Sequence, residues 1–317
     1  CQFNQVNYHQ NLYPILSSLM TERTNFSSRF TRMESFIQQL QDEICQALEK
    51  KDSRKFQEDC WKRNEGGGGR TRVLENGSFL EKGGVNISSV HGPMSDELAK
   101  QLGAKASFFG ACGISLVLHP RSPKIPTVHM NLRYFETLSG DCWYGGGIDL
   151  TPYFPYPEDF RHFHHTLQQV CERCIPDSYE EYKKNCDEYF SLPHRQEMRG
   201  IGGIFFDHLN GSEEKYYGLV HEVGEEFLNA YLPLVDRRIN EEWNDEDVEF
   251  QYYRRGRYVE FNLIYDRGTL FGIKSNGRIE SIFMSLPPKV DFRYNWEPRK
   301  NSPHHEMNDF YQPQNWC

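Results

Sequence analysis

The chain has 317 residues, with 36 Lys and Arg against 45 Asp and Glu, which gives a formal net charge of −9. Its composition is typical of a globular protein and unlike that of disordered or fibrous chains. No apolar run approaches the ~20 residues that a membrane-spanning helix needs. The acidic balance argues against nucleic-acid binding, because phosphate contacts need clustered Lys and Arg. An anionic ligand would therefore require basic residues concentrated at one place.

The nine cysteines are odd in number and irregularly spaced, which does not resemble a disulfide framework. This usage favours a reducing compartment. The sequence begins at Cys1 and shows no secretory presequence. We therefore expect a cytoplasmic location, with the mitochondrial intermembrane space after presequence removal as the alternative.

The N-terminal part of the chain is predicted to be an irregular arm followed by a helix. Residues 1–30 are rich in Asn, Gln and Ser. The helix is expected to start near Thr31, because Thr31 and Glu34 have the spacing of a capping box and apolar residues follow at helical intervals. The four glycines at 66–69 lack the Lys and Ser or Thr of a phosphate-binding loop, so no nucleotide site is expected there.

From Thr71 the hydrophobic period changes to two, which predicts a series of strands. A hairpin is expected at Asn76-Gly77, between strands 71–74 and 78–81. Three helices are predicted within 160–174, 178–190 and 216–234. Further strands are predicted at 85–90, 111–119, 127–136, 142–151, 201–207, 257–265, 269–274 and 278–285, the last two joined by a turn at Asn276-Gly277.

This order of elements favours an α+β fold, with helices packed on an antiparallel sheet in a single domain. The domain is predicted to cover residues 31–288, after the arm at 1–30. The tail at 289–317 is polar, contains proline and is expected to be irregular.

Strand 127–136 has a face that carries chemical groups. Its even-numbered positions from 128 to 134 are apolar, whereas the odd-numbered positions include His129, Asn131 and Arg133. Such a polar face ordinarily lies in water. The neighbouring strands favour a binding face instead, because Ser115 shares a face with a glycine and Asp149 follows three consecutive glycines.

The glycines at 145–147 offer no side chain to pack, so they indicate either the close approach of a ligand or a bulge in the strand. Asp149 lies in an apolar strand and must find a salt-bridge partner or a donor from a substrate, because burying it unpaired is costly. Both readings stay open at this point.

Arginines gather near glycines and turns, and several converging arginines would suit a polycarboxylate. Each arginine alone is expected to pair with one of the many acidic side chains. Arg133 and Arg278 stand out, because each lies on a predicted strand or turn beside glycine or amide groups. The others are Arg195, Arg199, Arg254, Arg255, Arg257 and Arg267.

Three other sites have weaker support. Cys171 and Cys174 form a single CxxC, whereas a zinc site needs a second pair or regularly spaced histidines. The histidines lack the spacing of known metal motifs, although a site remains an alternative. A hydrolase built from Ser115, His129 and Asp149 would want a nucleophile elbow, which the sequence lacks.

The same segments also form an ordered series of motifs. They are RNEGGGG at 63–69, GVNISSV at 84–90, HMNLRYFE at 129–136, WYGGGIDLTP at 143–152, RGIGGIFFD at 199–207, RRGRYVEFNLIYDRGT at 254–269 and RIESIFMSLP at 278–287. Over residues 33–288 this series resembles oxygen-dependent coproporphyrinogen III oxidase. The first 30 residues and the tail after Pro288 depart from the family's usual pattern.

The resemblance implies a large flat antiparallel sheet sandwiched between helices, in a homodimer that associates through residues around 257–292. It implies oxidative decarboxylation of two propionates of coproporphyrinogen III to vinyls, giving protoporphyrinogen IX, with O2 as co-substrate and no bound cofactor. His129 and Asp149 are implied to be catalytic. Substrate contacts are implied for Ser115, Asn131, Leu132, Arg133, Asn276, Gly277 and Arg278.

In the mechanism that we expect, ionised Asp149 holds the pyrrole N–H groups, His129 moves a proton, and Arg133 and Arg278 anchor propionates. Two rivals remain. One is a metal-dependent oxygenase, for which the resemblance offers His119, His129, His164 and His194 as divalent-metal ligands. The other is a non-catalytic tetrapyrrole-binding protein, which would retain the arginines without needing Asp149.

Overall fold

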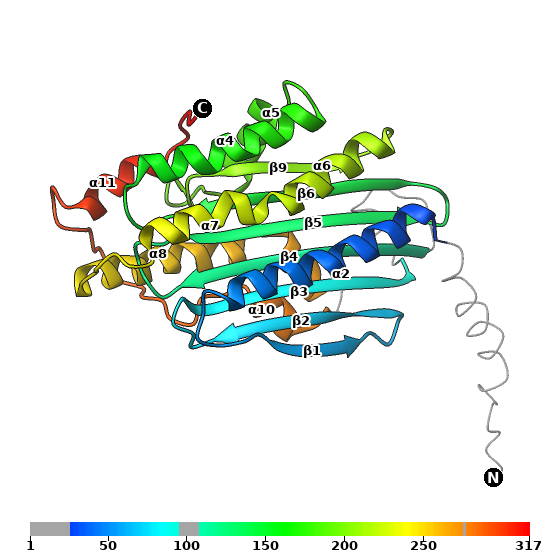
Figure 1. Ribbon diagram of the computed structural model, residues 1–317, viewed down its shortest axis with the longest axis horizontal. Coiled ribbons are helices and arrows are strands. Elements are labelled where there is room, and N and C mark those ends of the chain that lie inside the picture. The colour runs from blue at the N-terminus through cyan, green and yellow to red at the C-terminus, as the bar shows by residue number, and fades with distance from the viewer. Residues whose placement is uncertain (1–25, 95–107, 275–276) are drawn as a thin grey trace, which may run out of the picture.

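In residues 26–94, 108–274 and 277–317, which the computed structural model describes, the backbone forms a seven-stranded antiparallel sheet with helices on both faces (Figure 1). The strand order is β1-β2-β3-β4-β5-β6-β9, so strands adjacent in sequence are also neighbours in the sheet. A separate hairpin joins β7 to β8. The strands are β1 Gln57–Lys62, β2 Gly67–Glu75, β3 Leu80–Pro93, β4 Phe108–Pro120, β5 Thr127–Thr137, β6 Cys142–Thr151, β7 Ser191–Leu192, β8 Glu197–Met198 and β9 Gly203–Leu209.

Helices α2, α4, α6 and α7 cover one face of the sheet, and α8 and α10 lie behind it (Figure 1). Helix α5 packs along β9 at the edge of the sheet. The prediction of an α+β fold with a sheet between helices is therefore confirmed. The helices are α2 Ser28–Glu49, α4 Pro157–Cys174, α5 Tyr179–Tyr189, α6 Glu213–Glu225, α7 Phe227–Arg238, α8 Asp245–Ile264, α9 Arg267–Lys274, α10 Ile279–Phe283 and α11 Pro303–Phe310.

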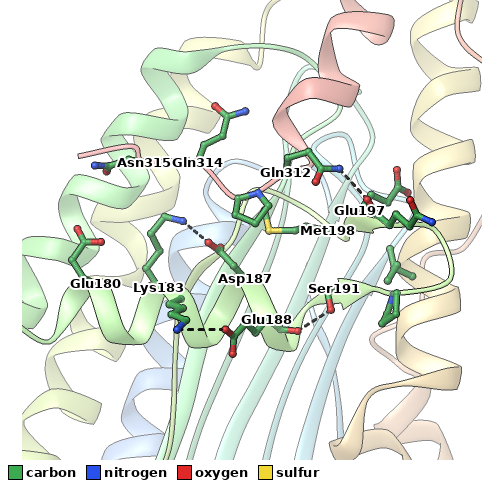
Figure 2. A pocket seen from close by; sticks show the side chains of 15 residues that line it. Glu180, Lys183, Asp187, Glu188, Ser191, Glu197, Met198, Gln312, Gln314 and Asn315 are labelled. Atoms are coloured by element: carbon green, nitrogen blue, oxygen red, sulfur yellow. Dashed lines mark hydrogen bonds and ion pairs between the residues drawn. The ribbon is translucent and has the colours of Figure 1, made fainter.

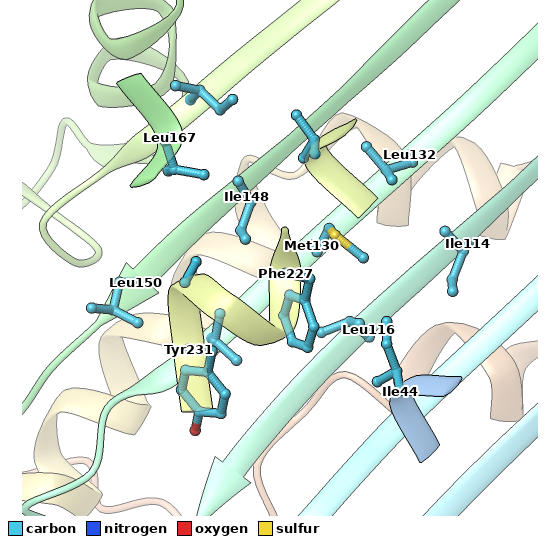
Figure 3. Packing of buried hydrophobic residues seen from close by; sticks show 14 of the residues in the cluster. Ile44, Ile114, Leu116, Met130, Leu132, Ile148, Leu150, Leu167, Phe227 and Tyr231 are labelled. Atoms are coloured by element: carbon cyan, nitrogen blue, oxygen red, sulfur yellow. The ribbon is translucent and has the colours of Figure 1, made fainter. Parts of the chain in front are cut away.

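The main core lies between the sheet and the front helices. Along β5 the even-numbered residues Val128, Met130 and Leu132 have no exposed surface. Figure 3 shows Met130 of β5 close to Phe227 of α7 within this layer of apolar side chains. Each such buried side chain stabilises the fold by roughly 1.5–3 kcal/mol. This packing fixes which face of every strand points away from the core.

The strand predictions in the first half of the sheet are confirmed. The predicted strands 111–119, 127–136 and 142–151 correspond to β4, β5 and β6. The Asn76-Gly77 hairpin joins β2 to β3, with Asn76 in the left-handed region at φ 58°. The predicted strand 85–90 lies within the single strand β3, and the predicted strand 78–81 overlaps its start, which is at Leu80. Strand β1 was not predicted, because its side chains are mostly exposed and half of them are charged.

The three strands predicted after residue 257 are wrong, because helices α8, α9 and α10 occupy this stretch. Its aromatic and β-branched residues have a local preference for strands, but tertiary burial overrides that preference. Asn244 and Asp247 form a reciprocal capping box that starts α8 thirteen residues before Arg257. The turn expected between two of these strands is also wrong: the Gly277 N–H bonds the carbonyl of Gly272 in α9, 2.7 Å away, and Asn276 lies outside the described residues.

Two helix predictions need smaller corrections. The helix expected from Thr31 begins at Ser28, because Ser27 is its N-cap and accepts a hydrogen bond from the Phe30 N–H. The single helix expected over 216–234 is two helices, α6 and α7. Pro233 cannot donate to the Asn229 carbonyl one turn after this junction, and His162 contacts that oxygen instead at 3.0 Å.

The C-terminal segment packs against the main core. It contains α11, so it is less irregular than predicted. The Tyr311 hydroxyl donates to the Pro152 carbonyl at 2.8 Å, and the Trp316 ring lies edge-on to Phe160. The proposed boundary at residue 289 stays a prediction.

All eight cysteines of the described residues are free thiols, which agrees with the prediction of no disulfide framework. In the same part of the chain, no helix combines the length and the apolar character that a bilayer-spanning segment needs.

Candidate active site

The rear face of the sheet is half-exposed over strands β3, β4 and β5, where small and polar side chains replace the apolar ones. Cross-strand pairing places Ser115 between Asn86 and Asn131. The next row places Gly113 between Ser88 and Arg133. We call this surface the polar floor; it consists of Asn86, Ser88, Gly113, Ser115, His129, Asn131 and Arg133.

A buried ion pair supports His129 at one end of the polar floor. His129 and Asp149 are directly opposite each other on β5 and β6, and the Nδ1 atom lies 2.7 Å from the carboxylate Oδ1. Arg199, in the loop after β8, donates from Nη2 to both oxygens of Asp149, at 3.0 and 2.8 Å. His129 remains 18% exposed, whereas Asp149 is only 2% exposed. The imidazole is therefore the member of this group that faces the polar floor.

Asp149 is ionised because of its two partners. Burial alone raises the pKa of its carboxyl group, but the charge of Arg199 and the hydrogen bond from His129 outweigh burial and lower that pKa below its usual range. The ionised carboxylate accepts a hydrogen bond from the Nδ1–H group of His129, so Nε2 is the ring nitrogen left for a ligand. Aromatic rings of Phe190, Tyr258 and Phe261 surround the Arg199 guanidinium.

This arrangement answers one question that the sequence left open. Asp149 has a salt-bridge partner, and both of its oxygens point to protein groups. In this conformation the Asp149 oxygens are therefore not available for the expected contact with pyrrole N–H groups. The sequence singled out Arg199 only as one of several arginines, because its pairing with a strand fifty residues away is a purely tertiary contact.

The glycines of β6 make room for Arg133 and its partner. Arg133 donates from Nη1 to Asn131 at 2.9 Å and pairs with Asp207 of β9 at 2.8 Å. A Cβ atom on Gly145 would lie 2.6 Å from the Asp207 carboxylate and 2.9 Å from the Arg133 Nε. The register between β6 and β9 also shifts beside Gly145, so the bulge that the glycine run indicated is present.

Arg278 lies at the opposite side of the polar floor, at the start of α10. It pairs with Asp59 of β1 and donates from Nη1 to the Ser281 hydroxyl at 3.1 Å. The Ser281 hydroxyl in turn lies 2.7 Å from that of Thr71 on β2. Both Arg133 and Arg278 are about one-third exposed, so either guanidinium can exchange its present carboxylate for one from a ligand.

Most of the predicted substrate-contact residues therefore come together. Ser115, Asn131 and Arg133 belong to the polar floor, and Arg278 borders it. Leu132 does not, because its side chain lies in the core on the other face of β5. A role for Leu132 is thus restricted to its backbone. Asn276 lies outside the described residues.

The family model for coproporphyrinogen III oxidase matches residues 32–316, which is nearly the whole chain. The chain belongs to the coproporphyrinogen III oxidase family. Its members decarboxylate coproporphyrinogen III in haem synthesis. A face that combines half-exposed arginines with a supported imidazole suits a tetrapyrrole that carries carboxylates.

The four histidines considered as metal ligands do not meet in this family member. His119 contacts Thr127 and the Ser285 carbonyl, at 3.2 and 2.8 Å. His164 lies on α4, on the core side of the sheet, and contacts Tyr179 and the Ile201 carbonyl. His194 contacts Glu260 and Tyr265. In the described part of the chain, no three His, Cys, Asp or Glu side chains are grouped as metal ligands. These four residues do not fit a shared metal site.

Arg254 and Arg255 hold the fold together and do not reach the polar floor. Arg254 pairs with Glu197 at 2.8 Å, and Arg255 pairs with Glu81 at 2.6 Å. Both are buried. These two arginines therefore do not converge on a ligand, and the simpler expectation of one acidic partner each holds for them.

A cavity lies away from the polar floor, between α5, the β7–β8 hairpin and the C-terminal segment (Figure 2). Its volume is about 710 Å³. Its lining includes Lys183 and Asp187, which pair with each other at 2.5 Å, and Glu197, which already binds Arg254. None of the predicted catalytic or substrate residues lines it. We place the candidate active site at the polar floor, because that surface holds the imidazole of His129 and Arg133 and is bordered by Arg278.

Proposed function

We propose that this protein is an oxygen-dependent coproporphyrinogen III oxidase that converts two propionates to vinyl groups and yields protoporphyrinogen IX. Each step is an oxidation: propionic acid side chain plus O2 gives vinyl, carbon dioxide and hydrogen peroxide. The propionate loses its carboxyl carbon and two hydrogens, and O2 accepts both electrons. The single observation that carries this proposal is a supported imidazole on a polar floor between two half-exposed arginines.

The polar floor supports binding of a flat macrocycle. The floor positions on β3 and β4, Asn86, Ser88, Gly113 and Ser115, project little or nothing above the backbone. Arg133 and Arg278 lie at opposite sides, and three strand spacings of ~4.8 Å separate β5 from β2, which amounts to about 14 Å. Propionates would replace Asp207 and Asp59 as their partners, and the bidentate geometry of arginine would hold the reacting chain in place.

His129 supplies the proton chemistry in this proposal. Its Nε2 atom accepts or returns a proton at the substrate, while Asp149 keeps Nδ1 protonated and the ring oriented. Asp149 thus acts through His129, and Arg199 keeps Asp149 ionised. The electron-rich pyrroles of the substrate supply the electrons, so we propose O2 as co-substrate without a bound cofactor.

The experiment compares turnover of coproporphyrinogen III under air and under argon, after treatment of the protein with excess chelator. We expect vinyl product under air alone, with one equivalent of hydrogen peroxide for each propionate lost. Product formation under argon would overturn the dependence on O2. Loss of activity in chelator that returns with a divalent metal would favour the metal-dependent rival, and binding without any product would favour the non-catalytic one.

We also propose that the protein works as a homodimer. Five aliphatic side chains on α8, α9 and α10 are exposed although each is large, and they fall within the stretch 257–292 expected at the interface. They are Leu263, Ile264, Leu270, Ile273 and Ile279. Sedimentation analysis of I264K is expected to give monomers where the unaltered protein gives dimers.

A further inference from the structure

Trp61 lies at the β1 edge of the sheet, on the same side as the polar floor. Its indole crosses the backbone of Gly69 on β2: a Cβ atom on Gly69 would lie 2.3 Å from Cζ2 and 2.6 Å from Cε2. The indole therefore needs glycine at position 69. The sequence alone offered no role for the four glycines at 66–69. The contact with Trp61 explains why position 69 is a glycine.

Trp61 and Arg133 lie at the two ends of one cross-strand row. Trp61 pairs with Gly69, and the row continues through Ser88 and Gly113 to Arg133. Four strand spacings of ~4.8 Å separate the ends, which is about 19 Å. The three positions between them carry no side chain larger than that of serine. Trp61 is thus the first bulky group that a flat ligand meets on moving from Arg133 toward β1.

The indole N–H also enters a chain of hydrogen bonds that ends at Arg278. Trp61 Nε1 donates to the Thr71 hydroxyl at 3.0 Å, and this hydroxyl donates its single proton to Asn86 Oδ1 at 2.6 Å. Ser281 must then be the donor in its 2.7 Å contact with Thr71. The Ser281 hydroxyl oxygen accepts a hydrogen bond from Nη1–H of Arg278, at 3.1 Å.

Every donor in this chain is therefore assigned, and its two arms, one from Trp61 and one from Arg278 through Ser281, meet at Thr71. Thr71 is its hub, because it accepts from Trp61 and Ser281 and donates to Asn86. Thr71 is 3% exposed, and the hydrogen bond between Thr71 and Ser281 is buried. The Thr71 hydroxyl is buried, donates one hydrogen bond and accepts two, so it fixes the position of Ser281 and, through Ser281, that of Arg278 relative to the sheet.

We propose that Trp61 is a positioning and specificity-determining residue for the tetrapyrrole substrate. Its ring closes the polar floor at the β1 edge, and its N–H, through Thr71 and Ser281, orients Arg278 toward a propionate. The ligand class is a flat tetrapyrrole with carboxylates at its periphery. This inference rests on the proposed function of the polar floor, since without a tetrapyrrole there is nothing for Trp61 to confine.

The test uses W61F, T71V and the double variant W61F/T71V in the full-length protein. W61F keeps an aromatic ring but removes the N–H together with one ring of the indole, and T71V keeps the shape of the hub. One hydrogen bond changes an equilibrium about five-fold. We expect KM for coproporphyrinogen III to rise about five-fold in W61F and about ten-fold in T71V, with kcat within two-fold of the unaltered protein. The matched control is W243F, which changes an exposed tryptophan and should leave both constants unchanged.

The double variant separates this role from a structural one. Because both residues act through the same chain, KM of W61F/T71V should not exceed that of T71V alone. Multiplied effects, or an unchanged KM in W61F, would overturn the inference. Binding of coproporphyrin III, the oxidised macrocycle that cannot turn over, should give the same ranking in Kd. A protein that shows this ranking without making vinyl product would reject the proposed reaction and retain the role of Trp61.

Discussion

The two faces of strand β5 differ completely although their residues alternate along one chain. Val128, Met130 and Leu132 are fully buried under the front helices, whereas His129, Asn131 and Arg133 are half-exposed on the rear face. The front face contributes stability, because its apolar side chains leave water. The rear face offers hydrogen bonds and charge that are not used up by the core. Because side chains alternate between the two faces of a strand, one face of β5 serves stability and the other carries the groups for chemistry.

Asp149 should be the clearest exception to this division, because replacing it should affect both stability and activity. It lies on the rear face, yet it is buried and neutralises Arg199. D149A should lower kcat by roughly 10²–10⁴-fold, because His129 loses its orientation. It should also lower the free energy of unfolding by about 3–5 kcal/mol, because a buried guanidinium is left unpaired. Product assays and urea unfolding measure the two effects.

The double variant D149A/R199M tests the cause of the instability. It removes both charges, so we expect stability to recover while activity stays low. A D149A protein with unaltered unfolding would contradict the role of the ion pair. An active D149A protein would contradict the catalytic assignment.

Met130 and Asn131 give the sharpest comparison, because they are adjacent residues on opposite faces. M130A removes a fully buried side chain and should lower the free energy of unfolding by about 2–5 kcal/mol, with KM unchanged. N131A removes a half-exposed amide and should cost less than about 1 kcal/mol while raising KM about five-fold. Denaturant unfolding and steady-state kinetics on both variants measure the two effects. The same response from the two proteins would mean that the faces do not divide these roles.

Arg133 should show an effect on substrate binding that is confined to the rear face. R133A removes a charged hydrogen-bond donor from the polar floor and should raise KM for the tetracarboxylate about 10–100-fold, with little change in kcat. R299A is the matched control, because Arg299 is 74% exposed and pairs with Glu246 at the surface. Equal KM values in the two variants would remove Arg133 from substrate binding.

Features that depend on local interactions could be predicted from the sequence, and features that depend on tertiary contacts could not. The period of two placed His129, Asn131 and Arg133 on one face, because alternation is a local property of a strand. It failed for α8, where Arg254, Arg255 and Tyr258 are all buried and no amphipathic pattern remains. The Asn244-x-x-Asp247 spacing was the signal that could have found this helix.

The site was predictable only where its residues lie on one strand or match a family motif. The ion pair of Asp149 with Arg199 and the contact of Trp61 with Gly69 join segments whose pairing no local pattern encodes. Trp61 was missed for a second reason: its strand is mostly exposed and half of its residues are charged, so it lacks the alternation that reveals a half-buried strand.

The front layer also contains a group that makes its stability depend on pH. His164 is fully buried; its Nδ1 lies 2.9 Å from the Tyr179 hydroxyl, and its Nε2 lies 3.1 Å from the Ile201 carbonyl. Nε2–H therefore donates to the carbonyl, Nδ1 accepts from the hydroxyl, and the ring is neutral. Burial is the main cause that lowers its pKa from 6.5 to about 3.

The sign of the effect follows from where the proton binds. As the pH falls below 6.5, the unfolded chain protonates His164 while the folded protein does not until about pH 3. Stability is therefore complete above pH 6.5 and declines toward acid, by about 1 kcal/mol between pH 6.5 and 5.5 from this residue. H164Q keeps a donor and an acceptor but cannot titrate, so its unfolding free energy should decline less over this interval. Parallel pH profiles for the two proteins, measured by urea unfolding, would show that His164 is not the group responsible.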